Sequence, residues 1–130
     1  MTQSTVRRVL VADDDPDILD LLTLNLECHG YQVHAAADGE QAREMAMRML
    51  PDLVVLDVMM PKMDGLEVLA ALKAHPETRD IPVVMLTAKA SDSDVWQGWQ
   101  AGADYYITKP FDLDELMRFI GYLQVNAPVR

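Results

Sequence analysis

Acidic, hydroxyl and ammonium side chains follow several short apolar runs of this chain, at the point where each run ends. In chain order they are Asp13, Asp14 and Asp15 after residues 6–12, Asp57 after residues 53–56, Thr87 after residues 81–86, and Lys109 after residues 105–108. If the runs are parallel strands of one sheet, their carboxyl ends meet at one edge, where open α/β sheets bind ligands. We therefore expect three or more carboxylates, a hydroxyl and an ammonium group to line one crevice.

This set of groups suits a metal-assisted transfer of phosphate. Clustered carboxylates repel one another, and a hard divalent cation relieves that repulsion. Mg²⁺ prefers oxygen ligands and commonly uses one or two carboxylates with waters and phosphate oxygens. Lys109 and Thr87 suit the remaining phosphate oxygens, as a point charge and a hydroxyl donor. Because aspartyl phosphates are a known class of intermediate, the residues predict a Mg²⁺-dependent acceptor of a phosphoryl group.

Short apolar runs alternate with amphipathic stretches along the chain, which indicates strands alternating with helices. The expected strands cover residues 6–12, 31–36, 53–56, 81–86 and 105–108, and the expected helices cover residues 15–29, 40–50, 66–75, 91–101 and 112–124. Right-handed crossovers make such strands parallel, with helices on both faces. We predict an α/β fold of the flavodoxin-like (βα)5 type, doubly wound around a five-stranded parallel sheet. The strand order 2-1-3-4-5 is taken by analogy with known doubly wound proteins.

The length of 130 residues suggests one domain. We expect an N-terminal tail over residues 1–5, the domain over residues 6–124, and a C-terminal tail or truncated linker over residues 125–130. The single cysteine, Cys28, excludes an internal disulfide framework and a cysteine-based zinc site. We expect Cys28 to be a buried apolar residue.

The charge and the apolar pattern exclude several classes of function. A formal net charge of −10 argues against broad nucleic-acid binding, which needs a basic surface. No apolar run approaches the ~18 residues that a membrane span needs. Residues 1–8 carry two arginines but no long apolar stretch follows them, so they do not form a signal peptide. We expect a soluble cytoplasmic domain that contacts neither nucleic acid nor membrane through this segment.

Four segments of the chain resemble the receiver domain of two-component response regulators. They are residues 9–16 (VLVADDDP), 52–65 (DLVVLDVMMPKMDG), 86–88 (LTA) and 101–111 (AGADYYITKPF). Each segment alone is moderately specific, and all four in this order and at these spacings are highly specific. The resemblance extends over about residues 6–124, which is nearly the whole chain.

The resemblance implies a role for each acidic position. Asp57 matches the residue that accepts the phosphoryl group. Asp14 matches a direct Mg²⁺ ligand, and Asp13 its acidic neighbour, which acts mostly through water. The backbone carbonyl of Met59 matches the third protein ligand, after Asp14 and Asp57. Mn²⁺ is the expected substitute for Mg²⁺.

The resemblance also implies a phosphate-binding residue and a switch pair. Lys109 matches the lysine that binds the phosphoryl group, and its bond to Pro110 is expected to be cis, a minority state even for bonds that precede proline. Thr87 and Tyr106 match the switch pair, in which the Thr87 hydroxyl moves to a phosphoryl oxygen and the Tyr106 ring turns inward. A simpler reading of Tyr106, as core filler, stays open.

The function implied by the resemblance is a phosphorylation-dependent signalling switch. A histidine kinase or phosphotransfer protein would donate the phosphoryl group to Asp57, and the domain would catalyse this transfer and a slow dephosphorylation without being a turnover enzyme. The surface formed by residues 91–101, 105–108 and 112–124 would then change and control an output partner or domain. Homodimerisation through that surface is left open. The output, the cognate kinase and the lifetime of the phosphorylated state are not encoded in recognisable motifs.

Two other functions are alternatives to the switch. A haloacid-dehalogenase-like phosphatase uses an Asp-x-Asp motif after the first strand, which Asp13 and Asp15 superficially supply, but the chain has no cap domain and no acidic pair after the fourth strand. A phosphorylation-independent binding module would not need repelling carboxylates to be kept together. Asp15 itself is expected to be only a helix cap.

Several side chains near these motifs have open roles. Met59 lies two residues after Asp57, and Lys89 lies two residues after Thr87. The resemblance implies that the side chains at these two positions vary within the family and control the approach of water to the acyl phosphate. We hypothesise that apolar Met59 shields the phosphoryl group, so that a Met59→Asn variant would lose phosphate faster. Trp96 and Trp99 are spaced as neighbours on one helix, and either a core or a partner surface fits them.

Overall fold

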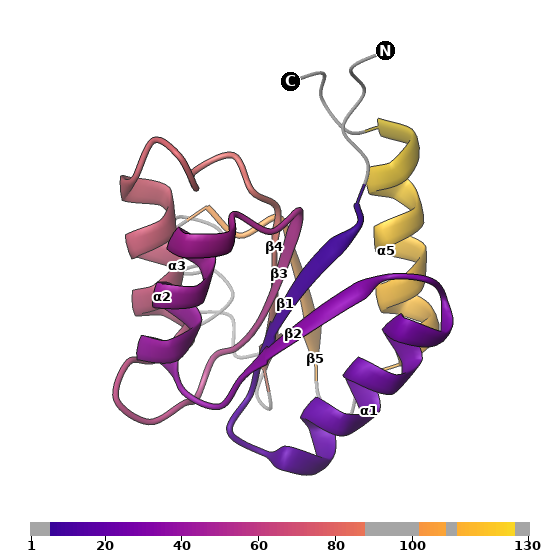
Figure 1. Cartoon of the computed structure of the whole chain (residues 1–130), viewed down its shortest axis with the longest axis horizontal. Coiled ribbons are helices and arrows are strands. Elements are labelled where there is room, and N and C mark those ends of the chain that lie inside the picture. Colours follow the sequence, from indigo (N-terminus) through magenta and orange to yellow (C-terminus); the bar gives the residue numbers. More distant parts are fainter. Residues whose placement is uncertain (1–5, 88–101, 109–111, 127–130) are drawn as a thin grey trace.

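The computed structural model describes residues 6–87, 102–108 and 112–126. Its elements are β1 (Arg8–Ala12), α1 (Pro16–Cys28), β2 (Gln32–Ala36), α2 (Gly39–Met49), β3 (Leu53–Asp57), α3 (Gly65–Ala74), β4 (Val83–Thr87), β5 (Tyr105–Thr108) and α5 (Leu113–Asn126). The five strands form one sheet in the order β2-β1-β3-β4-β5, and every pair is parallel (Figure 1). The predicted flavodoxin-like fold and its strand order are confirmed. The helix expected at residues 91–101 lies outside the described residues.

The sheet has helices on both faces, and each face has its own hydrophobic core. Figure 1 shows α1 and α5 on one face and α2 and α3 on the other. All residues of β3 and β4 are buried, as expected for strands covered on both sides. Successive strand residues point to opposite faces, so Leu10 joins the cluster under α2 and α3, whereas Val11 joins the cluster under α1 and α5.

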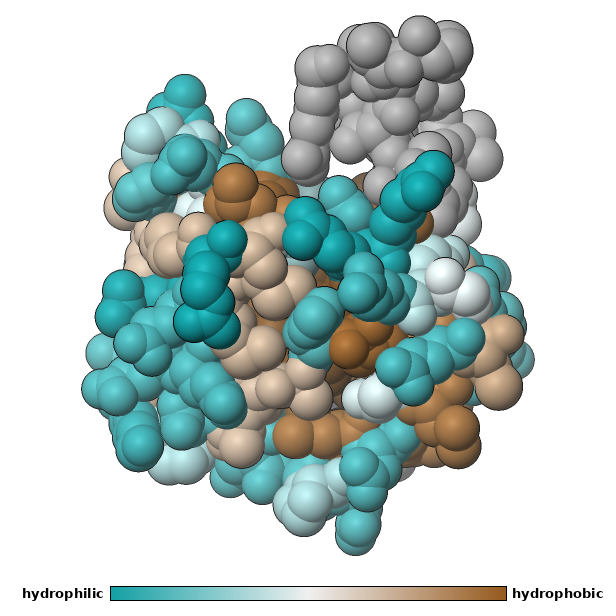
Figure 2. Space-filling model, viewed as in Figure 1, coloured by the Kyte–Doolittle hydropathy of each residue, from teal (hydrophilic) through white to brown (hydrophobic). Residues whose placement is uncertain are grey.

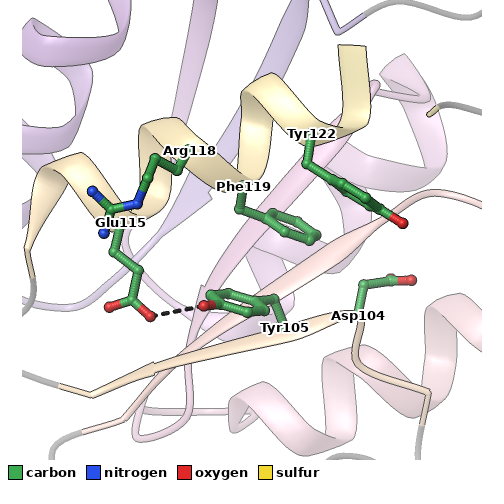
Figure 3. A pocket seen from close by; sticks show the side chains of 6 residues that line it. All are labelled: Asp104, Tyr105, Glu115, Arg118, Phe119 and Tyr122. Carbon is green, nitrogen blue, oxygen red and sulfur yellow. Dashed lines mark hydrogen bonds between the residues drawn. The ribbon is translucent and has the colours of Figure 1, made fainter. Parts of the chain in front are cut away.

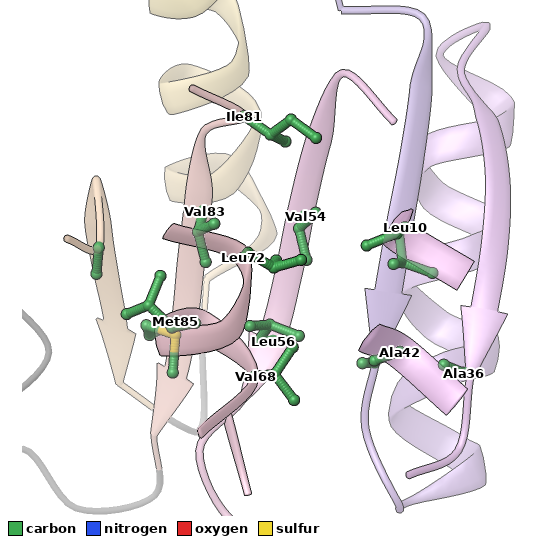
Figure 4. Close-up of a cluster of buried hydrophobic side chains, with 14 of the residues drawn as sticks. Leu10, Ala36, Ala42, Val54, Leu56, Val68, Leu72, Ile81, Val83 and Met85 are labelled. Carbon is green, nitrogen blue, oxygen red and sulfur yellow. The ribbon is translucent and has the colours of Figure 1, made fainter. Parts of the chain in front are cut away.

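The two cores are built from aliphatic side chains of the strands and of the inner helix faces. The cluster under α2 and α3 includes Leu10, Ala42, Leu56, Val68, Leu72 and Met85 (Figure 4). The cluster under α1 and α5 includes Val11, Leu22, Leu26, Val55, Leu116 and Ile120. Full burial of one such aliphatic side chain contributes about 1.5–3 kcal/mol, so these contacts hold the strand ends in fixed positions.

α1, α2 and α3 each begin directly after an aspartate whose side chain caps the first turn. Asp15 Oδ1 accepts the Asp17 N–H at 2.9 Å, which confirms the predicted capping role of Asp15. Asp38 Oδ1 accepts the Gln41 N–H at 2.8 Å at the start of α2. Asp64 caps α3 in the same way and exchanges two hydrogen bonds with Glu67. These caps satisfy backbone donors that the helix itself leaves unpaired.

The structure differs from the sequence-based expectations at several element ends. β4 begins at Val83, after Pro82, because proline has no N–H to donate to a strand ladder. α5 runs to Asn126, two residues past its expected end. The expected burial of Cys28 is wrong, because Cys28 is exposed. It lies two positions after buried Leu26, which turns it to the opposite side of α1.

The outer face of α1 carries apolar residues at the surface. Leu21 is 46% exposed and Leu24 is 67% exposed. Figure 2 shows hydrophobic residues at the surface over α1, whereas hydrophilic residues cover the outer sides of α2 and α3. Among the described residues, no helix is both long enough and apolar enough to span a bilayer.

Candidate functional site

Three carboxylates meet at the carboxyl edge of the sheet. One oxygen from each of Asp13, Asp14 and Asp57 lies within 4.8 Å of the other two. Ala12 and Leu56 are register partners on β1 and β3, so the residues that follow them lie at the same level. Asp13 and Asp57 are buried, with 0% and 4% of their surface exposed, whereas Asp14 is exposed. The structure thus brings together the three acids that the sequence predicted would converge.

The turn between β1 and α1 fixes the first two of these acids. The Asp13 N–H donates to the carbonyl of Ala36 on β2 at 3.2 Å. Asp13 Oδ1 accepts the Asp15 N–H at 2.9 Å, so its side chain closes the turn that leads into α1. The backbone therefore holds Asp13 from both sides, and Asp14 is left at the solvent-exposed point of the turn.

Asp57 begins a loop whose backbone folds back on the end of β3. Asp57 Oδ1 accepts the Met59 N–H at 3.4 Å, which orients the carboxylate. The Val58 N–H donates to the carbonyl of Leu86 at 2.9 Å, and the Gly65 N–H donates to the carbonyl of Val58 at 2.9 Å. The side chain of Met59 is 72% exposed, so an apolar group stands at the surface two residues from Asp57. The predicted shielding role of Met59 stays a prediction.

Thr87 lies at the same edge on the neighbouring strand. Asp57 is the register partner of Leu86, and Thr87 is one residue further along β4 and only 4% exposed. Tyr106 on β5 is the register partner of Met85 and packs against the cluster under α2 and α3. Because strand side chains alternate with a period of two, Thr87 and Tyr106 belong to the same face of the sheet. Their predicted pairing as a switch stays a prediction.

The lysine expected at this site lies outside the described residues. The structure describes Thr108, which ends β5, but not Lys109 or Pro110. The predictions on Lys89, Trp96 and Trp99 also concern residues outside the described ranges. The described part of the site therefore consists of the acidic group, Thr87 and Tyr106.

The acidic group fits a hard divalent cation. All three side chains offer carboxylate oxygens, which are the ligands that Mg²⁺ prefers. Two of the three carboxylates are buried, and burial of negative charges so close together is costly unless a cation compensates them. The donor chemistry of Asp13, Asp14 and Asp57 therefore agrees with the predicted Mg²⁺ requirement.

The amino-acid sequence matches a known domain family over residues 9–121, and the description of that family is "Response regulator receiver domain". The chain belongs to the response regulator receiver domain family. It is therefore a phosphorylation-dependent signalling domain of the two-component type. The matched residues lie within the predicted domain boundaries at residues 6 and 124, which themselves stay a prediction.

Curated relatives agree with this membership. The DNA-binding dual master transcriptional regulator RpaA of Synechocystis sp. is 48% identical over 110 residues, which cover 85% of this chain and 46% of the relative. Response regulator MprA of Mycobacterium sp. strain KMS is 46% identical over 122 residues, which cover 93% of this chain and 52% of the relative. The chain thus spans about half the length of the curated relatives that it matches.

Solved structures share the receiver fold. Chemotaxis protein CheY4 of Vibrio cholerae superposes with a TM-score of 0.85 at 30% identity, covering 91% of this chain and 98% of the other. A putative response regulator from Chloroflexus aurantiacus superposes with a TM-score of 0.86 at 34% identity, covering 94% and 100%. Matches that cover nearly all of both chains show that the receiver domain of this family extends over most of this sequence.

Sequence reasoning missed two glycines that border the site. Gly39 and Gly65 each begin a helix, and each presses against the backbone of the loop that follows Asp57. Both follow an aspartate cap, so an Asp-Gly pair at a helix start was the available signal. That signal indicates a helix start, but it does not reveal which distant segment the glycine touches.

Proposed function

We propose that this domain accepts a phosphoryl group on Asp57 from a histidine kinase or phosphotransfer protein, with Mg²⁺ as cofactor. The observation that carries the proposal is the meeting of the Asp13, Asp14 and Asp57 carboxylates within 4.8 Å at the carboxyl edge of the sheet. Asp14, Asp57 and the backbone carbonyl of Met59 would hold the ion, and Asp13 would act through water. Mn²⁺ would substitute for Mg²⁺.

The chemistry is a direct displacement at phosphorus. A carboxylate oxygen of Asp57 forms a bond to phosphorus while the phosphorus–nitrogen bond of a phosphohistidine donor breaks, and the electron pair leaves with the imidazole nitrogen. The Met59 N–H, which donates to Asp57 Oδ1, orients the attacking carboxylate. When bound, Mg²⁺ would neutralise charge on the phosphoryl oxygens, and Lys109 would add a second positive group.

The switch step is proposed for Thr87 and Tyr106. Phosphorylation adds about −1.5 to −2 charge beside carboxylates that already crowd the site. The Thr87 hydroxyl would donate to a phosphoryl oxygen, and the Tyr106 ring, on the same face of the sheet, would turn into the space that Thr87 leaves. The support is the adjacency of β4 and β5 and the partial burial of Tyr106. The domain would therefore act by shifting populations rather than by turning over a substrate.

The described part of the proposed output surface is the β5–α5 side of the molecule. A hollow of about 500 Å³ lies there, and Figure 3 shows its lining. It is lined by Asp104, Tyr105, Glu115, Arg118, Phe119 and Tyr122. Aromatic residues favour interfaces, so this hollow supports β5 and α5 as a contact surface for an output domain, a partner or a second copy of the chain.

We also propose partners and a cellular location for this domain. Response regulators partner with histidine kinases, and RpaA is described as DNA-binding, so a DNA-binding output is a reasonable partner for this domain. We propose that this segment does not itself contact nucleic acid, because its net charge of −10 would repel phosphates. The cytoplasmic location expected from the sequence belongs to the same proposal.

The direct test is phosphorylation in vitro followed by intact-mass analysis. Wild-type protein incubated with Mg²⁺ and a small acyl phosphate should gain the mass of one phosphoryl group, and Asp57→Asn should gain none. Chelation of Mg²⁺ should abolish the gain. A wild-type protein that gains no phosphoryl mass would refute the switch. Turnover of a phosphomonoester that needs Asp13 but survives Asp57→Asn would support the dehalogenase-like phosphatase instead.

A further inference from the structure

The loop that connects β3 to α3, residues 58–64, is pressed against the first residue of α2. Gly39 is buried, and a Cβ added at Gly39 would overlap the backbone carbonyl group of Met63. The Gly39 N–H also donates to the carbonyl of Pro61 at 3.4 Å. Any side chain at position 39 would therefore have to push the loop away from α2.

An ion pair joins the same two segments. Lys62 Nζ lies 3.6 Å from Asp38 Oδ2. The other oxygen of Asp38 caps α2, so the side chain that holds the helix start also holds the loop. Lys62 has a φ of 69°, a left-handed conformation that persists in a non-glycine residue only where the surroundings enforce it. The loop is thus held in a shape that Lys62 would not adopt by preference.

The end of the loop that leads into α3 is held against the backbone of Asp57. A Cβ added at Gly65 would overlap the backbone carbonyl of Asp57. The Gly65 N–H donates to the carbonyl of Val58 at 2.9 Å, which closes the loop on itself. Residues 58–64 therefore run between two helix starts, and both approaches require glycine. Asp57 ends β3 directly before this loop, and Met59 is the second residue of the loop, so the position of the loop affects the placement of the Met59 carbonyl and of the Asp57 carboxylate.

We propose that Gly39, together with the Asp38–Lys62 ion pair, is a positioning element for the metal site. By letting α2 touch the loop at Met63, Gly39 fixes the backbone that presents Met59 and Asp57 to Mg²⁺. Gly39 itself contacts neither ion nor substrate. This inference rests on the proposed function, because it assigns a cause to the Mg²⁺ affinity of that same site.

The test compares Gly39→Ala with Gly121→Ala. Gly121 lies within α5, and a Cβ there would have nothing within 4 Å, so it is a matched glycine-to-alanine control. Titration calorimetry with MgCl₂ should show Mg²⁺ binding at least tenfold weaker in Gly39→Ala and unchanged in Gly121→Ala. Urea unfolding in the presence of a chelator measures any purely structural effect separately.

Three possible results of these measurements decide whether Gly39 positions the metal site. Weaker Mg²⁺ binding by Gly39→Ala with a similar unfolding midpoint in chelator supports the positioning role. Unchanged Mg²⁺ affinity in Gly39→Ala, with normal binding and phosphorylation by the wild type, overturns this inference and leaves the proposed function intact. Absence of Mg²⁺ binding and of phosphorylation in the wild type overturns both.

A second variant keeps the test decisive if Gly39→Ala does not fold. Asp38→Asn retains the cap of α2, because asparagine caps helices as well as aspartate, but it loses the charge that attracts Lys62. We expect Mg²⁺ binding to weaken about twofold to threefold in Asp38→Asn. Equal affinity in Asp38→Asn and the wild type, with Gly39→Ala unfolded, would refute the positioning role of this contact.

Discussion

The pKa of Tyr105, on the β5–α5 surface, is changed by the side chains around it. Its hydroxyl donates to Glu115 Oε2 at 2.9 Å, and its ring stacks on Phe119 with a centroid separation of 4.8 Å (Figure 3). The hydrogen bond to the Glu115 carboxylate raises the pKa of Tyr105 above its ordinary value of 10.0, with a smaller contribution from burial. The raised pKa therefore keeps the hydroxyl protonated, and its hydrogen bond from β5 to α5 intact, to a higher pH than that at which an unperturbed tyrosine ionises.

The raised pKa of Tyr105 predicts a loss of stability at alkaline pH. A group with a raised pKa in the folded state contributes its stabilisation in full below the unfolded value, here 10.0, and loses it as the pH rises through the folded value. The free energy of unfolding of the wild type, measured in urea, should therefore fall above pH 10.0 more steeply than that of Tyr105→Phe. Tyr122→Phe retains the Tyr105–Glu115 bond and should behave as the wild type does. Parallel curves for the wild type and Tyr105→Phe would contradict this prediction.

Some helix ends are determined by the local sequence, and others depend on the tertiary structure. The starts of α1 and α2 follow from aspartates that cap the first turn. The cap at Asp15 was predicted from the sequence, whereas α2 was expected from residue 40 without a stated cap and begins at Gly39. The end of α2 is different, because Leu50 adopts a left-handed conformation with a φ of 49° while its N–H donates to Ala46. Glycine is the residue expected at such a position, so no local signal indicated this conformation.

Because Leu50 has a left-handed conformation, replacing leucine by glycine should have opposite effects on stability at Leu50 and at Leu24. Leu50→Gly removes the steric penalty of the conformation and should raise the free energy of unfolding by about 0.5–1 kcal/mol. Leu24→Gly, in the exposed interior of α1, should lower it by about 1 kcal/mol. Urea unfolding at neutral pH measures both. Destabilisation by Leu50→Gly as large as that by Leu24→Gly would show that the Leu50 side chain, not its backbone, decides the outcome.

At the scale of the whole molecule, the fold gathers negative charge at one edge of an already acidic protein. The chain carries a formal net charge of −10, and two of its buried polar residues are the carboxylates Asp13 and Asp57. Packing of both cores forces these groups together, because β1 and β3 are neighbours in register. The folded state without a cation therefore contains a local repulsion that the unfolded chain does not have.

Mg²⁺ should therefore stabilise the folded state specifically. An ion that binds only the native state adds about 2.7 kcal/mol to the free energy of unfolding at a concentration a hundredfold above its dissociation constant. Urea unfolding with and without MgCl₂ should show a gain of this order in the wild type and a much smaller gain in Asp14→Asn. NaCl at matched ionic strength is the control. An equal gain from NaCl would attribute the effect to general screening of the net charge.

The meeting of the acids could be predicted from the sequence, because the carboxyl ends of parallel strands share an edge of the sheet. The strand order was predicted only by analogy with known doubly wound proteins, and the structure confirms it. Asp13, Asp14, Asp57 and Thr87 could be placed at that edge without coordinates. The contact between Gly39 and the β3–α3 loop could not be predicted, since it depends on how α2 sits beside a segment more than twenty residues away in the sequence. The exposure of Cys28 was missed because an apolar residue type was taken as evidence of burial.

Because the Cys28 thiol is exposed, a spectroscopic label can be attached to it in the native sequence. Cys28 is the only cysteine, and it ends the 13-residue helix α1, whose first turn follows the acidic group. At 1.5 Å per residue the helix is about 20 Å long, so a maleimide dye on Cys28 would sit well away from Asp57. A fluorophore or spin label could be attached there without mutating any other residue and could report on phosphorylation from a distance.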